Sequence, residues 1–166
     1  AYFSYYHFDT ARAKGYTGKG VTIAVIVGPI DTSNPALKGA NITDKSRCTI
    51  QDSPEGVRHS TDMAIILVSP ISGVAPDATL YNYQAFTGST TSNGSCDSNG
   101  GRLNKVSALI NQAVEDGAQI ISVSQSVNES TNELKWAITN AITRGVIIYL
   151  FYTSDAADAP TPRLVH

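Results

Sequence analysis

Three apolar segments of the chain have the pattern of strands inside a parallel sheet. Residues 21–27 form a nearly continuous run rich in β-branched side chains, which is typical of a strand covered on both faces. Two further apolar segments, 119–124 and 146–152, are also expected to be strands. In residues 78–86 the side chains alternate between two sides in the manner of a strand, which predicts a fourth strand. Its two sides carry Leu80, Asn82 and Gln84, and Tyr81, Tyr83 and Ala85, respectively.

Apolar residues at helical spacing predict helices between these strands. Residues 63–68 are expected to form a buried helix, and residues 103–114 a longer one that ends before Gly117, a helix stop signal. A third helix is expected over 130–145, where the first four residues, Ser-Thr-Asn-Glu, have the pattern of a capping box. A short helix capped by its first residue is expected over 9–14, and the aromatic arm before it is expected to pack on the body.

This alternation of strands and helices predicts the fold class. Parallel strands joined by helices require right-handed crossovers, so the expected fold is α/β, a three-layer open parallel sheet with helices on both faces. In such sheets ligands bind beyond the carboxyl ends of the strands. The positions at that edge are Val27, Ser124 to Ser126, and Thr153 to Asp155. His59, near the start of a predicted helix, can face the same edge.

Charge and composition exclude several classes of partner. The formal net charge is −2 and the lysines and arginines are not clustered, so we expect no binding to nucleic acid or to an anionic membrane. No apolar run approaches the roughly 18 residues that span a bilayer. No pair of histidines or cysteines has zinc-ligand spacing, and we expect no cofactor.

The two cysteines, Cys48 and Cys96, lie in polar, turn-rich segments. The second is in a long stretch of Ser, Thr, Asn and Gly, residues 87–101, which we expect to be an exposed loop. A disulfide between the two loops, which would suit a secreted protein, and two free thiols are both compatible with the sequence.

Two blocks of the chain resemble the subtilisin-like serine proteases (subtilases). The first runs from Val57 through His59 to Ala64 and continues as Gly73-Val-Ala-Pro-Asp-Ala78, similar to the family's histidine block H-G-T-H-V-A followed by G-V-A-P-x-A. The second, Val21 to Leu37, is similar to the aspartate segment. The resemblance implies one subtilase-like domain over 1–166, with a family-like core over 9–148 and a divergent tail over 149–166. It also implies the activity of a serine endopeptidase.

The resemblance also shows where the catalytic residues are replaced. His59 is the retained histidine, whereas Val27 occupies the position of the catalytic aspartate and Ser154 that of the asparagine that stabilises the oxyanion. Ser124, Gln125 and Ser126 match the edge that holds substrate as an added strand. No segment resembles the nucleophile block. Because a triad needs a nucleophile, an imidazole and a carboxylate that orients it, we expect this chain to be inactive.

Two nearby carboxylates are the available substitutes for the missing aspartate. Asp31 lies four residues beyond Val27, on the order of 13 Å away along an extended chain, and Asp62 lies three residues after His59 on the same helix. We expect neither to orient the imidazole, because the first is too far away and the second approaches from the wrong side.

Two other functions remain open at this stage. The chain is either a pseudoprotease that binds or regulates a protein or peptide partner, or one half of a split or truncated protease. In both cases the last predicted strand is expected to associate with a partner or with a second copy, because an unpaired apolar edge favours association. The resemblance implies a secreted or extracytoplasmic location.

Overall fold

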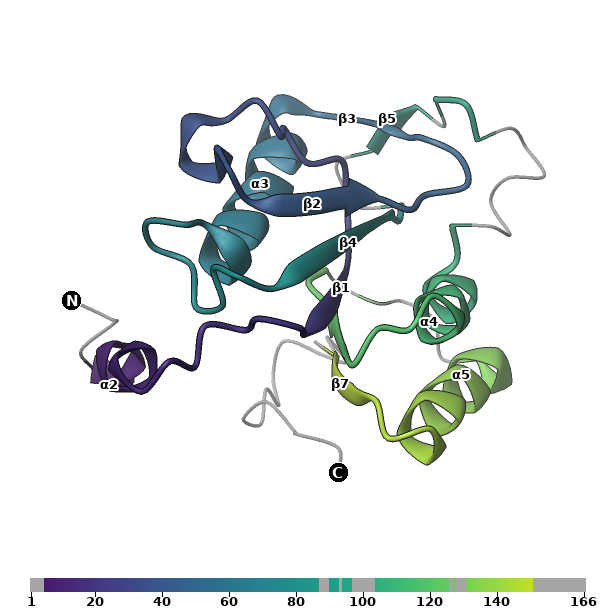
Figure 1. Cartoon of the computed structure of the whole chain (residues 1–166). Helices are drawn as coiled ribbons and strands as arrows, with labels where there is room; N and C mark the ends of the chain where they lie inside the picture. Colours follow the sequence, from purple (N-terminus) through teal and green to yellow (C-terminus); the bar gives the residue numbers. More distant parts are fainter. Residues whose placement is uncertain are drawn as a thin grey trace.

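The computed structural model describes residues 5–86, 90–92, 94–96, 104–125, 127 and 131–150. Its centre is a five-stranded parallel sheet in the order β2-β4-β1-β6-β7 (Figure 1). The strands, in that order, are Asn41–Asp44, Thr79–Gln84, Thr22–Val27, Ile120–Val123 and Ile147–Leu150. A second, two-stranded antiparallel sheet pairs β3 (Gln51–Asp52) with β5 (Thr90–Ser92).

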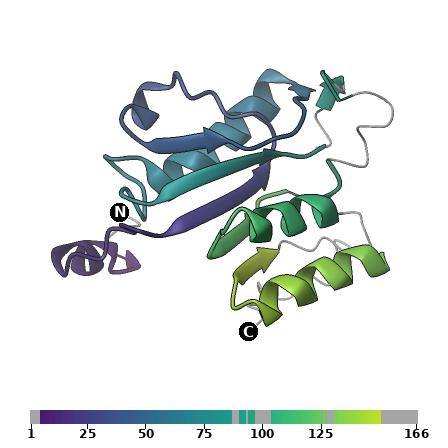
Figure 2. The same ribbon diagram turned by 45° about the vertical axis from the view of Figure 1, so that its right-hand side comes forward.

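Helices cover both faces of the large sheet. On one face lies α3 (Pro54–Val68), and on the other α4 (Val106–Glu115) and α5 (Asn132–Thr143) lie side by side, as Figures 1 and 2 show. A short helix, α2 (Phe8–Ala13), precedes β1, and a 3₁₀ helix, η1 (Pro35–Leu37), follows it. The three-layer α/β architecture predicted from the sequence is therefore confirmed.

Alternate residues of β1 build two separate cores. Ile23, Val25 and Val27 pack on the α3 side, where they meet Ala64 and Val68 of that helix. Ala24 and Ile26 pack on the other side among apolar residues of α4 and α5. Because both faces of the strand are covered, its sequence is a continuous apolar run rather than an alternating one.

The structure extends the predicted histidine helix by about two and a half turns at its N-terminal end, to Pro54. Ser53 is its N-cap and accepts a hydrogen bond from the backbone N–H of Gly56 at 3.1 Å, and Pro54 occupies the first helical position. Ser and Pro at these positions begin a helix, but the polar residues that follow gave no apolar pattern. His59 therefore lies in the second turn of α3 and not at its start.

Three other local predictions were wrong or shifted. In the described part of the N-terminal arm, Tyr5 and Tyr6 are 76% and 62% exposed and do not pack on the body, whereas Phe8 is half-buried. The N-cap of α5 is Thr131, whose hydroxyl accepts from the N–H of Leu134 at 3.3 Å, so the helix begins one residue later than the predicted box requires. The strand β2 was not predicted, since its sequence Asn-Ile-Thr-Asp at the edge of the sheet is mostly exposed and polar.

The cysteines form a disulfide. Cys48, between β2 and β3, is bonded to Cys96, which follows β5. Of the two arrangements that the sequence allowed, the disulfide is the one present. None of the helices in the described ranges is long and apolar enough to cross a bilayer.

Candidate active site

The carboxyl ends of β1 and β6 meet beside the helix that carries the histidine. The N–H of Ser124, just after β6, donates to the carbonyl of Ile26 at 3.1 Å. Along a strand the N–H and C=O of one residue point to the same side, so the carbonyl of Ser124 also faces β1, at the point where that strand ends. This carbonyl lies 2.9 Å from Nε2 of His59. The histidine thus continues the ladder between β1 and β6.

This contact determines which nitrogen of His59 carries a proton. A carbonyl oxygen accepts hydrogen bonds and does not donate them, so Nε2 must be the donor. In the neutral ring the proton is then on Nε2, and Nδ1 is the acceptor. The ring is otherwise open to solvent, because His59 belongs to the exposed residues of α3.

The turn of α3 around His59 is anchored by its two neighbours. The hydroxyl of Ser60, which is fully buried, donates to the carbonyl of Gly56 at 3.0 Å. The hydroxyl of Thr61 donates to the carbonyl of Val57 at 2.7 Å and accepts from the N–H of Asp31 at 3.0 Å. The second contact joins the helix to the loop after β1, so the relative position of the two motifs is fixed by hydrogen bonds. The polar Ser-Thr pair gave no signal of this role in the sequence.

Val27, the predicted counterpart of the catalytic aspartate, is the last residue of β1. Its side chain is fully buried on the α3 side of the sheet. In the register of β1 and β6, Ile26 pairs with Val123, so Ser124 is the next residue opposite Val27. Neighbouring strands lie about 4.8 Å apart, and the ring of His59 reaches the carbonyl of Ser124. Val27 therefore lies within about one strand spacing of the residue that holds His59, and it offers no acceptor for a ring N–H.

The two substitute carboxylates lie on the outside of α3. Asp31 and Asp62 are exposed and line a shallow surface depression of about 220 Å³ together with Asn34, Pro54, Val57, Arg58 and Thr61. Oδ1 of Asp31 accepts from the N–H and the hydroxyl of Ser33, at 3.0 and 2.5 Å. Asp31 is thus engaged in its own turn, and His59 is not part of this depression.

The candidate substrate edge is partly described. The hydroxyls of Ser122 and Ser124 lie 2.9 Å apart, and Gln125 is half-buried. Ser126 and Ser154, as well as the other strand-end positions 153–155, lie outside the described residues. Within the described ranges, no three His, Cys, Asp or Glu side chains lie close enough together to bind a metal ion.

A sequence model of the subtilase family matches residues 18–152. The chain belongs to the subtilase family. It is 34% identical over 146 residues to the major intracellular serine protease of Bacillus subtilis (strain 168), and this alignment covers 82% of the chain and 43% of that protein. It is 30% identical over 142 residues to the minor extracellular protease Vpr of the same organism, covering 77% of the chain and 16% of Vpr.

Solved structures show the same fold. The prenylagaramide maturation protease PagA has a TM-score of 0.64 at 24% identity, with 85% of this chain and 48% of that chain covered. Fervidolysin from Fervidobacterium pennivorans, a keratinolytic enzyme related to subtilisin, has a TM-score of 0.62 at 20% identity, covering 82% of this chain and 22% of that chain. The chain thus spans less than half the length of each of these four relatives.

Proposed function

We propose that this chain is the histidine-bearing part of a subtilase peptidase domain and that it does not hydrolyse peptides by itself. The observation that carries the proposal is the bond between Nε2 of His59 and the carbonyl of Ser124, at 2.9 Å, beside a buried valine at the aspartate position. A general base takes the proton of the nucleophile at Nε2, while a carboxylate holds the proton on Nδ1. The arrangement of His59 is the reverse.

The expected loss of activity is large even if a nucleophile is supplied. In a bacterial subtilisin, a member of the same family, removal of the triad aspartate lowers kcat by roughly 3 × 10⁴-fold, and removal of the serine by roughly 2 × 10⁶-fold. Val27 replaces the aspartate here, and no serine of the 166 residues lies in a segment resembling the nucleophile block.

The experiment is labelling with a fluorophosphonate, which reacts with activated serines, in parallel with a peptide hydrolysis assay. We expect neither labelling nor hydrolysis, because Nε2 of His59 donates to the carbonyl of Ser124 and is therefore not free to take the proton of a serine. Subtilisin E serves as the positive control. Stoichiometric labelling of one serine that disappears in His59→Ala would disprove the proposal, since it would show a working serine-histidine pair.

The open edge of the sheet favours a second candidate, in which the chain works together with another polypeptide segment. Within the described residues, β7 is hydrogen-bonded to β6 on one side and lies at the end of the strand order. Ile147 on this strand is 55% exposed. An apolar strand with unpaired backbone groups is a surface for strand pairing. The partner in this candidate is a protein, either the complementary part of the protease domain or a second copy.

Sedimentation velocity at micromolar concentration tests this association. We expect a species heavier than a monomer, and we expect Ile147→Lys to shift it towards the monomer because a charge on an edge strand opposes pairing. Trp136→Lys is the matched control: Trp136 is 73% exposed, and it belongs to α5 and not to the strand. A clean monomer, or equal loss of association in both variants, would contradict β7 as the contact.

A third candidate function is that of a pseudoprotease module that binds peptides at Ser124, Gln125 and Ser126.

The cellular location is also a proposal. The relatives include an intracellular and an extracellular protease. The Cys48–Cys96 disulfide supports an extracytoplasmic location for this chain, since disulfides persist in oxidising compartments.

A further inference from the structure

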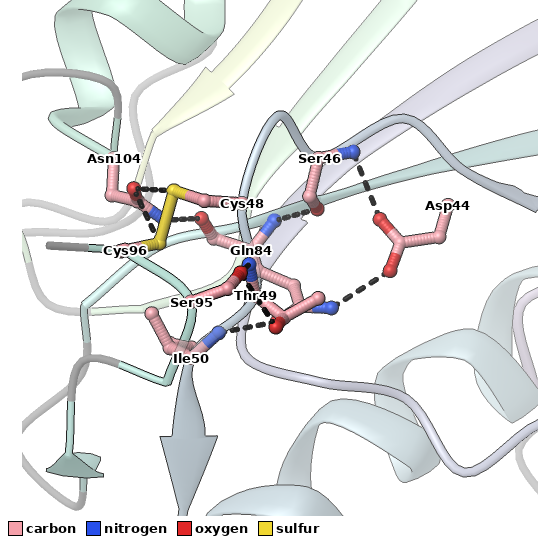
Figure 3. The surroundings of a disulfide bond; sticks show 9 residues. All are labelled: Asp44, Ser46, Cys48, Thr49, Ile50, Gln84, Ser95, Cys96 and Asn104. Carbon is pink, nitrogen blue, oxygen red and sulfur yellow. Dashed lines mark hydrogen bonds between the residues drawn. A yellow bond between two sulfur atoms is a disulfide. The ribbon is translucent and has the colours of Figure 1, made fainter. Parts of the chain in front are cut away.

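The disulfide lies in a polar cluster at the carboxyl end of β4, shown in Figure 3. Cys96 is 1% exposed and Cys48 is half-buried. Three side chains connect the surrounding backbone: Gln84, the last residue of β4, Ser46 and Asn104. Of these, Asn104 is 4% exposed and faces both sulfur atoms. This cluster plays no part in the contacts of His59 described above.

The amide group of Asn104 is held in one orientation. Its Nδ2 donates to the backbone carbonyl of Gln84 at 2.7 Å, and because a carbonyl cannot donate, the nitrogen and not the oxygen must face it. Oδ1 then points at the disulfide, 2.8 Å from Sγ of Cys48 and 3.0 Å from Sγ of Cys96. Oδ1 is thus in direct contact with both sulfur atoms.

A disulfide sulfur carries no proton, so neither contact is a hydrogen bond while the bond between the sulfurs is intact. When both cysteines are thiols, each S–H can donate to Oδ1, which has two lone pairs. Buried polar atoms are stabilised by hydrogen bonds and cost free energy without them. The position of Asn104 therefore favours the dithiol form relative to the disulfide form. A purely structural disulfide has no need of such an acceptor.

We propose that Cys48 and Cys96 are a reversible dithiol–disulfide pair and that Asn104 stabilises its reduced form. The reductant is a dithiol. Its thiolate attacks Sγ of Cys48, the more exposed sulfur, and the sulfur–sulfur bond breaks with Cys96 as the leaving thiolate, which takes up a proton. The second thiol of the reductant then attacks the mixed disulfide and releases Cys48, which is also protonated. The pair gains two electrons and two protons, and the reductant becomes a disulfide.

Reduction releases one side of the cluster and not the other. Residues 44–50 are held to β4 independently of the sulfurs: the backbone N–H of Ile50 donates to Oε1 of Gln84 at 2.9 Å, and Nε2 of Gln84 donates to Asp44 at 2.7 Å. Residues 94–96, in contrast, are bonded to Thr49 through Ser95 at 2.8 to 3.0 Å and through the N–H of Cys96 at 3.3 Å, and the disulfide is their covalent link to Cys48. We expect the reduced protein to loosen residues 90–96.

This release acts close to the helix that bears the histidine. The strand β5 (Thr90–Ser92) pairs with β3 (Gln51–Asp52), and Ser53, the next residue, is the N-cap of α3. Loss of the pairing removes a constraint on the residues that begin this helix.

The test is the equilibrium between disulfide and dithiol in dithiothreitol buffers, followed by thiol alkylation and mass spectrometry. Two neutral hydrogen bonds to Oδ1 predict that Asn104→Leu shifts the equilibrium constant about tenfold towards the disulfide. Asn140→Leu is the matched control, because this half-buried asparagine donates to Asn111 on α4 at 3.0 Å. We expect less than a twofold shift for it. An unchanged equilibrium in Asn104→Leu would overturn the proposal.

A second measurement uses the unaltered chain and does not depend on the folding of a variant. In the reduced protein, the Raman S–H stretching band is expected at the lowered frequency of hydrogen-bonded thiols, and amide exchange is expected to quicken in 90–96 while 79–84 stays protected. Bands at the frequency of free thiols would disprove that Asn104 stabilises the reduced form. Equal amide exchange in the two redox states would disprove that reduction loosens the loop.

Discussion

Substitution of Val27 by aspartate tests whether the position beside His59 still has the geometry of a catalytic aspartate. Val25 is the matched control: it lies two residues earlier on β1, is fully buried, and packs in the same apolar cluster on the α3 side. The same substitution at the two positions removes the same apolar side chain and buries the same carboxylate. The difference between them isolates the effect of the neighbours at the carboxyl end of the strand.

The magnitude follows from burial. An unpaired carboxylate in an apolar core costs about 3–5 kcal/mol, as does breaking a buried ion pair, and we expect this loss for Val25→Asp. At position 27 a rotated imidazole can pair with the new carboxylate, and a charge-assisted hydrogen bond contributes about 1.5–3 kcal/mol. The new bond replaces the bond between His59 and Ser124, so only part of this free energy is a net gain. We therefore expect Val27→Asp to be less destabilising than Val25→Asp by about 1–2 kcal/mol.

Urea unfolding at pH 7 measures both variants, alone and combined with His59→Gln. The difference between positions 25 and 27 is expected to vanish in the His59→Gln background, since the pairing is then lost. Val27→Asp is expected to hydrolyse no peptide, because triad residues act as a unit and the nucleophile is missing. Equal destabilisation at both positions, with His59 present, would refute the inference that Val27 and His59 are neighbours.

Two further predictions concern the frame around the site. Burial and the hydrogen bond of 2.8 Å to Asp116 raise the pKa of Tyr83 above its ordinary value; stability from this group is therefore complete below about pH 10 and falls by up to about 1.4 kcal/mol per pH unit above it. Tyr83→Phe should cost about 1–2 kcal/mol at pH 8 and less at pH 11 by urea unfolding; a constant cost would contradict this. Gly56→Ala should destabilise the protein by about 1–2 kcal/mol, because an added Cβ would overlap the carboxylate of Asp52. With Asp52→Ala the same change should instead stabilise α3 by about 0.5–1 kcal/mol; thermal unfolding that shows a loss in both backgrounds would refute the overlap.

The sequence predicted the fold best where burial imposes a pattern. The run at β1 is apolar throughout because α3 covers one face and α4 and α5 the other, and this constraint can be read without a structure. In contrast, β2 is a polar edge strand, and the first turns of α3 are set by the cap at Ser53. Neither segment has apolar residues at a regular spacing, so a prediction based on hydrophobic spacing missed both.

The candidate site divides in the same way. Strand ends and helix starts predicted that Val27, His59 and Ser124 share one edge, because parallel strands end together. The direction of the imidazole was not predictable, since it depends on a backbone carbonyl that carries no sequence signal. The role of Asn104 was not predictable for the same reason. Asparagine is common in loops, and the orientation of this amide group is set by its hydrogen bond to the backbone carbonyl of Gln84.

The bond between His59 and Ser124 gives this histidine a structural task that does not depend on catalysis. The ladder between β1 and β6 ends at Ile26 and Ser124, and it leaves the carbonyl of Ser124 facing the end of β1. A backbone carbonyl at a strand end needs a donor, and a histidine on α3 supplies one across the edge of the sheet. In this arrangement the ring of His59 links α3, which packs on one core, to the end of β6, a strand with residues in both cores. The aspartate position has no comparable structural task, because a valine fills the same space and adds apolar burial. A valine at position 27 together with a histidine at position 59 is therefore an arrangement that packing and hydrogen bonding favour, whatever the catalytic state of the chain.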